Sequence, residues 1–224
     1  MRYTDVVPGI FIARPNRFIA LCSVDGQEQV CHVKNTGRCK ELLVPGCRVY
    51  LQRSHDPARK TGFDLIAVKK SDRLINMDSQ APNRAAAEWL PCQLPTGSEL
   101  QAEYPFGHAR IDFYAQAGER RYLIEVKGVT LEQDGLALFP DAPTERGVKH
   151  LLTLTQAAAA GWQAIILFVI QMQSVRAFAP NRSTHPAFAD ALAQAAAGGV
   201  ALWAYDCAVT PDSMCLCAPV PILL

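Results

Sequence analysis

Residues 162–172, WQAIILFVIQM, constrain the fold of this chain more than any other segment. Apolar residues run without interruption from Ala164 to Ile170, whereas a half-exposed strand would alternate apolar and polar positions. A continuous run of this length predicts a strand that is buried on both faces. Such strands belong to sheets that are flanked by helices.

The segments around this strand predict the remainder of that domain. We expect a helix at 81–90 with Pro82 near its start, and a long amphipathic helix from about residue 144 with Thr144 as its N-cap. Between and after these helices we expect strands at 99–106, 110–116, 121–129 and 200–206, a loop at 131–143 and a helix at 186–199. The resulting order of helices and strands predicts an α/β domain with a mixed sheet flanked by helices.

The first 80 residues have a different texture. Short strand-like segments are separated by Gly, Pro, Asp and Asn turn signals, with no long helical period. These segments are 9–15, 17–25, 26–33, 47–54 and 63–71. They predict a small β-barrel, of which the OB-like barrel is one type. The fold class is therefore α/β plus a small β-barrel, with an OB-like domain at 1–80 and a second domain at 81–224.

Charge divides the chain at the same place. Residues 1–80 carry 13 Lys and Arg against 8 Asp and Glu, a net charge of +5, whereas residues 81–224 carry 9 against 13, a net charge of −4. A basic barrel suits DNA or RNA, and an acidic half suits carboxylates gathered around a divalent cation. A solvated surface that binds nothing is the competing interpretation. The barrel residues expected to bind nucleic acid are Arg14, Asn16, Arg17, Lys34, Asn35, Arg38, Arg59 and Lys60.

Membrane and disulfide classes are disfavoured. The apolar runs are too short to span a bilayer and the N-terminal residues lack a signal-peptide core, so we expect a cytoplasmic protein without a membrane partner. The chain has 8 cysteines but no CxxC pair. Cys215 and Cys217 are expected to point to opposite faces of a strand, so reduced structural thiols are expected instead of a zinc site.

RYLIEVKG, residues 121–128, places two charges in an otherwise buried strand. Glu125 and Lys127 are two residues apart and project to the same face, and pairing with the preceding strand would bring Asp112 to the same rim. Asp112 and Glu125 are hard ligands suited to Mg²⁺ or Mn²⁺, and Lys127 would orient a water or neutralise transition-state charge. These catalytic candidates predict metal-assisted phosphodiester hydrolysis. A salt bridge at a sheet edge is the alternative.

The spacing of these residues, D-x(12)-E-x-K, resembles that of the PD-(D/E)XK nuclease superfamily, with Ile111 in place of its nominal proline. Downstream, Arg146, Lys149 and His150 lie in the first turns of the expected helix and could form a phosphate-binding rim. Glu145 and Lys149 are also spaced for a simple surface ion pair.

Five motifs together resemble the sugar fermentation stimulation protein A family, in the same order over nearly the whole chain. They are HVKNTGRC, APNRAA, RIDF, YLIEVKGVTL and FPDAPTERGVKHL. Ala109 departs from the serine expected before RIDF. The resemblance implies an N-terminal OB-like domain, a nuclease-like C-terminal domain, DNA binding and a link to the regulation of sugar, notably maltose, metabolism genes. It carries the nuclease motif onto Asp112, Glu125 and Lys127.

Three functions follow as expectations. The first is a sequence-nonspecific DNA-binding protein with a working Mg²⁺- or Mn²⁺-dependent nuclease site. The second is a DNA-binding regulator without catalysis, and the third is a carbohydrate-binding regulator, since OB folds also bind sugars. The complete Asp, Glu and Lys set favours the first, and the basic N-terminal half favours nucleic acid over a neutral sugar.

Overall fold

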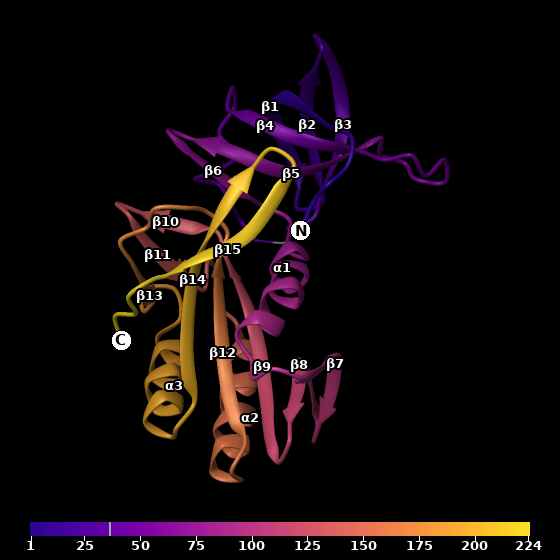
Figure 1. Cartoon of the computed structure of the whole chain (residues 1–224). Coiled ribbons are helices and arrows are strands. Elements are labelled where there is room, and N and C mark those ends of the chain that lie inside the picture. Colours follow the sequence, from indigo (N-terminus) through magenta and orange to yellow (C-terminus); the bar gives the residue numbers. More distant parts are fainter. Residues whose placement is uncertain (36) are drawn as a thin grey trace.

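The computed structural model describes residues 1–35 and 37–224. A small barrel made by the N-terminal strands lies at one end, and a larger sheet with helices along it forms the other part (Figure 1). The C-terminal hairpin of β14 (Ala201–Thr210) and β15 (Ser213–Pro219) rises from the larger sheet toward the barrel (Figure 1). The two parts therefore meet along a shared boundary.

The N-terminal strands close into the predicted OB-like barrel. They follow the order β3-β2-β1-β4-β5-β6, and β3 also pairs in parallel with β5, which closes the ring. The strand β6, after a two-residue turn, is an addition that the sequence pattern did not reveal. The strands are β1 (Val6–Asn16), β2 (Ile19–Val24), β3 (Gln27–Val33), β4 (Arg48–Arg53), β5 (Phe63–Lys70) and β6 (Arg73–Asn76).

The second half contains the predicted mixed sheet, in the order β15-β14-β12-β9-β8-β7. Strand β12 runs parallel to both of its neighbours, β9 and β14, whereas the outer pairs are antiparallel. Strand β15 was not predicted. The remaining strands are β7 (Glu99–Phe106), β8 (Ala109–Ala117), β9 (Arg120–Val129) and β12 (Gln163–Ile170), and the helices are α1 (Ala81–Trp89), η1 (Leu90–Cys92), α2 (Glu145–Ala159) and α3 (Pro186–Ala197).

The continuous apolar run of β12 is explained by helices on both faces of the sheet. Ile165, Leu167 and Val169 pack in one core with α1 residues. Ile166 and Phe168, on the other face, pack in a second core with α2 and α3 residues. Thr144 caps α2 as predicted, because its side chain accepts a hydrogen bond from the amide of Gly147.

The expected loop at 131–143 was wrong in part. It contains the hairpin of β10 (Leu131–Gln133) and β11 (Leu136–Phe139), and β11 pairs in parallel with β13 (Ala177–Pro180). The turn is Asp134-Gly135, with both φ angles positive at 50° and 79°. An Asp-Gly pair between apolar residues is a known hairpin signal, so this element was readable from the sequence.

The N-terminal residues pack against the second half. The amino group of Met1 donates a hydrogen bond to the carbonyl of Met214 at 2.8 Å and pairs with Glu88 at 2.7 Å. The amide of Tyr3 donates to the carbonyl of Asp212 at 2.8 Å. The division of the chain at residue 80 stays a prediction, and the first three residues contact the part that follows it.

The orientation expected for Cys215 and Cys217 was wrong. Both are exposed, while Leu216 between them is buried, because residues i and i+2 of a strand point to the same face. All eight cysteines are free thiols. Within residues 1–35 and 37–224, the helices are too short or too polar to cross a membrane.

Candidate active site

Asp112, Glu125 and Lys127 converge in the middle of the large sheet. Strand β9, which carries Glu125 and Lys127, lies between β12 and β8, so this pair is not at a sheet edge. The ladder between β8 and β9 ends at Phe113 and Ile124. Beyond that point the carboxylate of Asp112 accepts the amide of Val126 at 2.8 Å. The side chain thus replaces a backbone partner where the two strands separate.

Helix α1 fixes the second oxygen of Asp112. The amide nitrogen of Asn83, in the first turn of α1, donates to Asp112 Oδ1 at 2.7 Å. Each carboxylate oxygen can accept two hydrogen bonds, so both oxygens of Asp112 keep acceptor capacity.

Glu125 is the buried carboxylate of the site. Its Oε1 atom accepts a hydrogen bond from Lys127 Nζ at 2.6 Å and one from His150 Nδ1. Its Oε2 atom is buried and has no hydrogen-bond partner among the described residues. Only 2% of the Glu125 side chain is exposed, and an unpartnered anionic oxygen at that depth calls for a positively charged or hydrogen-bonding group.

The two carboxyl groups are shifted in opposite directions. Burial, and then the neighbouring charge of Glu125, raise the pKa of Asp112 above its ordinary value. Burial also acts to raise the pKa of Glu125, but the hydrogen bond from His150 and the charge of Lys127 outweigh it and hold that pKa below its ordinary value. A positive charge placed near Asp112 would oppose the two effects that raise its pKa, and so favour its ionised form.

His150 lies deeper than the surface rim expected for it. It is buried on the inner face of α2 and contacts Glu125. Its Nε2 atom accepts a hydrogen bond from Arg146 Nε at 3.3 Å, so the proton belongs on Nδ1, which donates to Glu125. Arg146, by contrast, is exposed. Glu145 pairs with His185 at 3.2 Å instead of with Lys149.

The side chains of Asp112, Glu125 and Lys127 line an open cleft of about 550 Å³. We call it the acidic cleft, and define it by Asn83, Glu103, Asp112, Glu125, Lys127 and Arg146. Glu103 on β7 has a φ of 59°, which is unusual for a residue with a side chain. Arg84, next to Asn83 in α1, also lines the cleft.

The protein donors in the cleft suit a hard cation that keeps part of its water shell. In the described part of the chain, no three or more His, Cys, Asp or Glu side chains are arranged to hold a metal. Glu103 pairs with Arg110, which leaves the carboxylates of Asp112 and Glu125. Mg²⁺ is commonly held by one or two carboxylates together with waters and substrate phosphates. The unpartnered Glu125 Oε2 fits such an ion.

Several of the barrel residues predicted to bind nucleic acid are engaged within the protein. Arg14 donates to four backbone carbonyls, of Arg17, Asn35, Gly37 and Arg38, at 2.7–3.0 Å. Lys34 pairs with Asp64 at 3.2 Å and with Asp78 at 3.7 Å. Asn16 and Asn35 accept backbone amides of nearby turns, and Arg59 pairs with Asp64. Lys60 is exposed.

Other predicted residues are brought together in one cavity of the barrel. Arg17 and Arg38 are exposed and line a pocket of about 500 Å³, together with Arg14 and Asn16. Lys40, which the sequence did not single out, also lines it, and Leu43 and Ala142 contribute apolar surface. We call this cavity the barrel pocket. Its exposed cations can contact phosphate groups, whereas the guanidinium of Arg14 mainly organises the loop.

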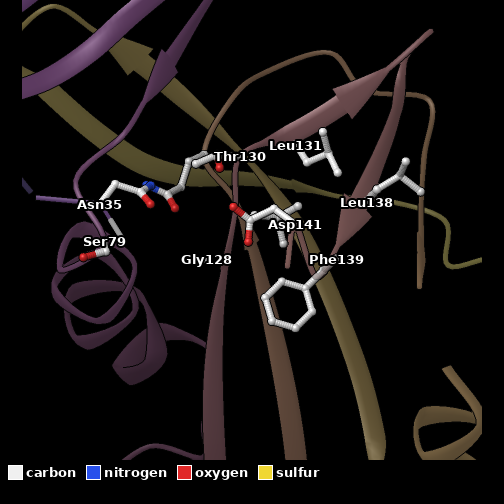
Figure 2. Close-up of a pocket in the computed structure, with 10 residues that line it drawn as sticks. Asn35, Ser79, Gly128, Thr130, Leu131, Leu138, Phe139 and Asp141 are labelled. Carbon is white, nitrogen blue, oxygen red and sulfur yellow. The ribbon is translucent and has the colours of Figure 1, made fainter. Parts of the chain in front are cut away.

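A small polar pocket of about 120 Å³ lies between the barrel loop and the second half. Figure 2 shows Asn35 reaching from the barrel side toward the carboxylate of Asp141, with Thr130 nearby. Ser79 lines both this pocket and the acidic cleft. This polar pocket therefore adjoins the acidic cleft at Ser79.

Sequence reasoning did not identify Asn83, Arg84 and Glu103. Asn83 follows Pro82 at the start of α1, beside the buried positions Ala81 and Ala85. A polar residue next to the apolar side of a helix was the available signal. Glu103 sits in a strand pattern with no local mark of its positive φ.

Two domains of one protein family match the chain. Residues 12–77 match "SfsA N-terminal OB domain", and residues 80–213 match "Sugar fermentation stimulation protein RE domain". The curated relatives are similar over nearly their whole length. A "Sugar fermentation stimulation protein homolog" of Desulfitobacterium hafniense is 56% identical over 217 residues, which cover 96% of this chain and 94% of that protein.

Proteins with the same name are found in other bacteria. That of Ruminiclostridium cellulolyticum is 54% identical over 211 residues, 93% of each chain, and that of Clostridium perfringens is 46% identical over 230 residues, 100% of each. A solved structure, "The structure of Pyrococcus Furiosus SfsA in complex with Ca2+", has a TM-score of 0.89 and 23% identity, covering 100% of this chain and 98% of that one. This likeness shows the same fold. The predicted family is confirmed, and the chain belongs to the sugar fermentation stimulation protein (SfsA) family.

Proposed function

We propose that this protein binds DNA without sequence preference through its barrel and hydrolyses phosphodiester bonds in the acidic cleft with the help of Mg²⁺ or Mn²⁺. The observation that carries the proposal is the buried, unpartnered Oε2 atom of Glu125, beside Lys127 and across from Asp112. A buried charge is costly unless it is paired and hydrogen-bonded, and a cation would supply the partner that Oε2 lacks among the described residues.

The residues of the cleft suit distinct roles. Asp112 and Glu125 would hold the cation, which would act as a Lewis acid on the scissile phosphate. Lys127, 2.6 Å from Glu125 Oε1, would orient the attacking water or neutralise charge that develops on the phosphate. His150 and Asn83 position Glu125 and Asp112, respectively. Arg84 and Arg146, which also line the cleft, can bind phosphates.

The relative from Pyrococcus furiosus supports a cation site in this family, since its structure is described as a complex with Ca²⁺. Ca²⁺ and Mg²⁺ both prefer oxygen ligands, and they differ mainly in size and coordination number. The barrel pocket supports nucleic-acid binding, because Arg17, Arg38 and Lys40 line it and cationic grooves with apolar walls are typical of OB-fold binding sites.

A second candidate is a DNA-binding regulator of sugar, including maltose, metabolism genes without catalysis. The observation that favours it is that Glu125 Oε1 is already neutralised by Lys127 and that both Asp112 oxygens accept hydrogen bonds. In that case the cluster serves only to join α1 and α2 to the sheet.

One experiment separates the two candidates. Purified protein is incubated with end-labelled single- and double-stranded DNA in Mg²⁺, Mn²⁺ or EDTA, alongside Glu125→Gln and the matched control Glu119→Gln, an exposed acid in the turn before β9. Metal-dependent cleavage that Glu125→Gln abolishes and Glu119→Gln retains supports the nuclease. Binding without cleavage under every condition supports the regulator.

A further inference from the structure

A second groove lies directly beside the acidic cleft. It runs between the β7–β8 hairpin and helix α2, and its volume is about 580 Å³. We call it the side groove and define it by Phe106, His108, Arg110, Arg146, Lys149 and Leu152. It shares Arg146 with the acidic cleft, so a chain lying in one can continue into the other.

The rim of the side groove is cationic. Arg146 and Lys149 come from α2, His108 comes from the β7–β8 turn, and Arg110 comes from the start of β8. Arg110 pairs with Glu103 and Arg146 donates to His150. Lys149 is exposed and forms no salt bridge with any described residue. Its ammonium group is therefore available to an anionic ligand.

The walls of the side groove are apolar and held in place. Phe106 packs edge-on against Trp162 with ring centroids 5.0 Å apart, and Arg121 lies 4.3 Å over the other ring. Phe106 is consequently a fixed aromatic surface. On the side of α2, Leu152 is 51% exposed. A planar base fits against such walls, and base–aromatic stacking is tolerant of sequence.

We propose that the side groove holds one unpaired nucleotide next to the phosphate that is cleaved, with its base against Phe106 and its phosphate near Lys149. This inference rests on the proposed function, and it specifies the substrate as a single strand or a frayed end. A base inside a duplex is stacked on both of its faces, so it cannot also cover Phe106.

The test measures binding without cleavage. Fluorescence anisotropy in EDTA compares a fluorescein-labelled 12-nucleotide oligo-dT with a blunt 12-base-pair duplex. Phe106→Leu keeps the apolar bulk but removes the aromatic face, and Phe106→Tyr retains it. We expect Phe106→Leu to weaken single-strand binding about tenfold with little change for the duplex, and Phe106→Tyr to bind like the wild type.

Lys149→Ala tests the phosphate contact, with Lys69→Ala, at an exposed position on β5, as its control. We expect Lys149→Ala to weaken single-strand binding severalfold and to reduce the slope of log affinity against log salt concentration by about one unit. Lys69→Ala should change neither quantity. Thermal melting checks that each variant is folded; Lys149→Ala changes only an exposed side chain, so it remains informative if Phe106→Leu unfolds.

The outcomes distinguish this inference from the proposed function. If Phe106→Leu and Lys149→Ala bind the single strand like the wild type, or if they weaken duplex binding equally, the side groove is not an unpaired-nucleotide site, whether or not the protein cleaves DNA. If the variants lose single-strand affinity but the wild type cleaves nothing with Mg²⁺ or Mn²⁺, the site stands and the nuclease proposal fails.

Discussion

His150 on α2 donates a hydrogen bond through Nδ1 to Oε1 of Glu125 on β9, and so joins a helix to the central part of the sheet at a buried charge. Arg146 donates to the opposite ring nitrogen, which sets the tautomer of His150. With Lys127 on the same oxygen, both donors hold Oε1, and Oε2 is the atom that remains for a further ligand.

His150→Ala is expected to lower the free energy of unfolding by about 2 kcal/mol, because it removes a hydrogen bond to a buried charge. It should also reduce any cleavage, since Glu125 loses its fixed orientation. His150→Asn places an amide donor near the position of Nδ1 and should recover part of both losses. Urea denaturation and cleavage assays measure them. Equal stability of His150→Ala and wild type would show that the contact carries no net energy.

Glu132 joins the second half to the barrel, and its ionisation should make the free energy of unfolding depend on pH. Burial alone would raise its pKa, but hydrogen bonds from Lys70, the Gly135 amide and Arg73 lower it from 4.5 to about 2. Because the folded-state pKa is below the unfolded one, the stabilisation is present above about pH 4.5 and is lost as the pH falls toward 2.

Glu132→Gln should therefore lower the free energy of unfolding by about 2 kcal/mol at pH 7. The same substitution should flatten the fall in stability between pH 4.5 and pH 2. Denaturant titrations across this range measure both effects. Glu119→Gln, at an exposed turn position, should stay within about 0.5 kcal/mol of wild type. A variant as acid-sensitive as the wild type would exclude Glu132 as the source.

Charge reversal on the barrel should separate binding residues from structural ones. Arg17→Glu and Arg38→Glu should weaken binding to unrelated DNA sequences and flatten its salt dependence, by about one unit of slope for each phosphate group that is no longer bound. Lys34→Glu should instead destabilise the fold, because it places a third carboxylate beside Asp64 and Asp78. An unchanged salt slope in Arg17→Glu and Arg38→Glu would move DNA binding off the barrel pocket.

Much of the fold was predictable because its signals are local. The unbroken apolar run of β12, the turn signals between the barrel strands and Thr144 at the start of α2 each specify an element within a few residues. The short strands β6 and β13 were not predictable in the same way. Each has four residues, which are too few to show a period. Strand β6 is held by pairing with β5, and β13 is held by pairing with β11, which lies far from it in the sequence.

The site was predictable where strand geometry determines it and not where tertiary contacts do. Glu125 and Lys127 share a face because they are two residues apart, and Asp112 joins them by strand pairing. No sequence pattern indicates that the Arg14 side chain points inward and donates hydrogen bonds to backbone carbonyls. The burial of His150 likewise depends on how α2 lies on the sheet, which the i,i+4 spacing from Arg146 does not specify.

Gly128, directly after Lys127, allows α1 to approach the sheet. A Cβ atom at this position would lie 2.5 Å from Gln171 Oε1 and 2.7 Å from Pro82 Cγ. Gly128→Ala should therefore push α1 outward, weaken the Asn83–Asp112 hydrogen bond and lower the free energy of unfolding by about 1–3 kcal/mol. Gly62→Ala is the control, since a Cβ there meets nothing within 4 Å. Thermal melting that does not distinguish these variants would show that the helix can shift freely.

Metal binding should be visible in thermal melting without any substrate. Because Asp112 and Glu125 repel each other, Mg²⁺ or Mn²⁺ should stabilise the fold by mass action, by about 2.7 kcal/mol at a hundredfold excess over Kd. For a chain of this size that is an increase in Tm of roughly 5–10 °C. Asp112→Asn and Glu125→Gln should lose most of this increment while they keep the DNA affinity of the barrel.

Lys127→Ala should behave differently from the two carboxylate variants, because lysine is not a ligand of such ions. It should retain the metal-dependent rise in Tm and lose cleavage, since the water is no longer oriented and the developing charge is no longer neutralised. Glu119→Gln should keep both properties. If the wild type and all of these variants melt identically with and without metal, and none cleaves DNA, then Glu125 and Lys127 form only a structural ion pair and the binding-only function is the one to retain.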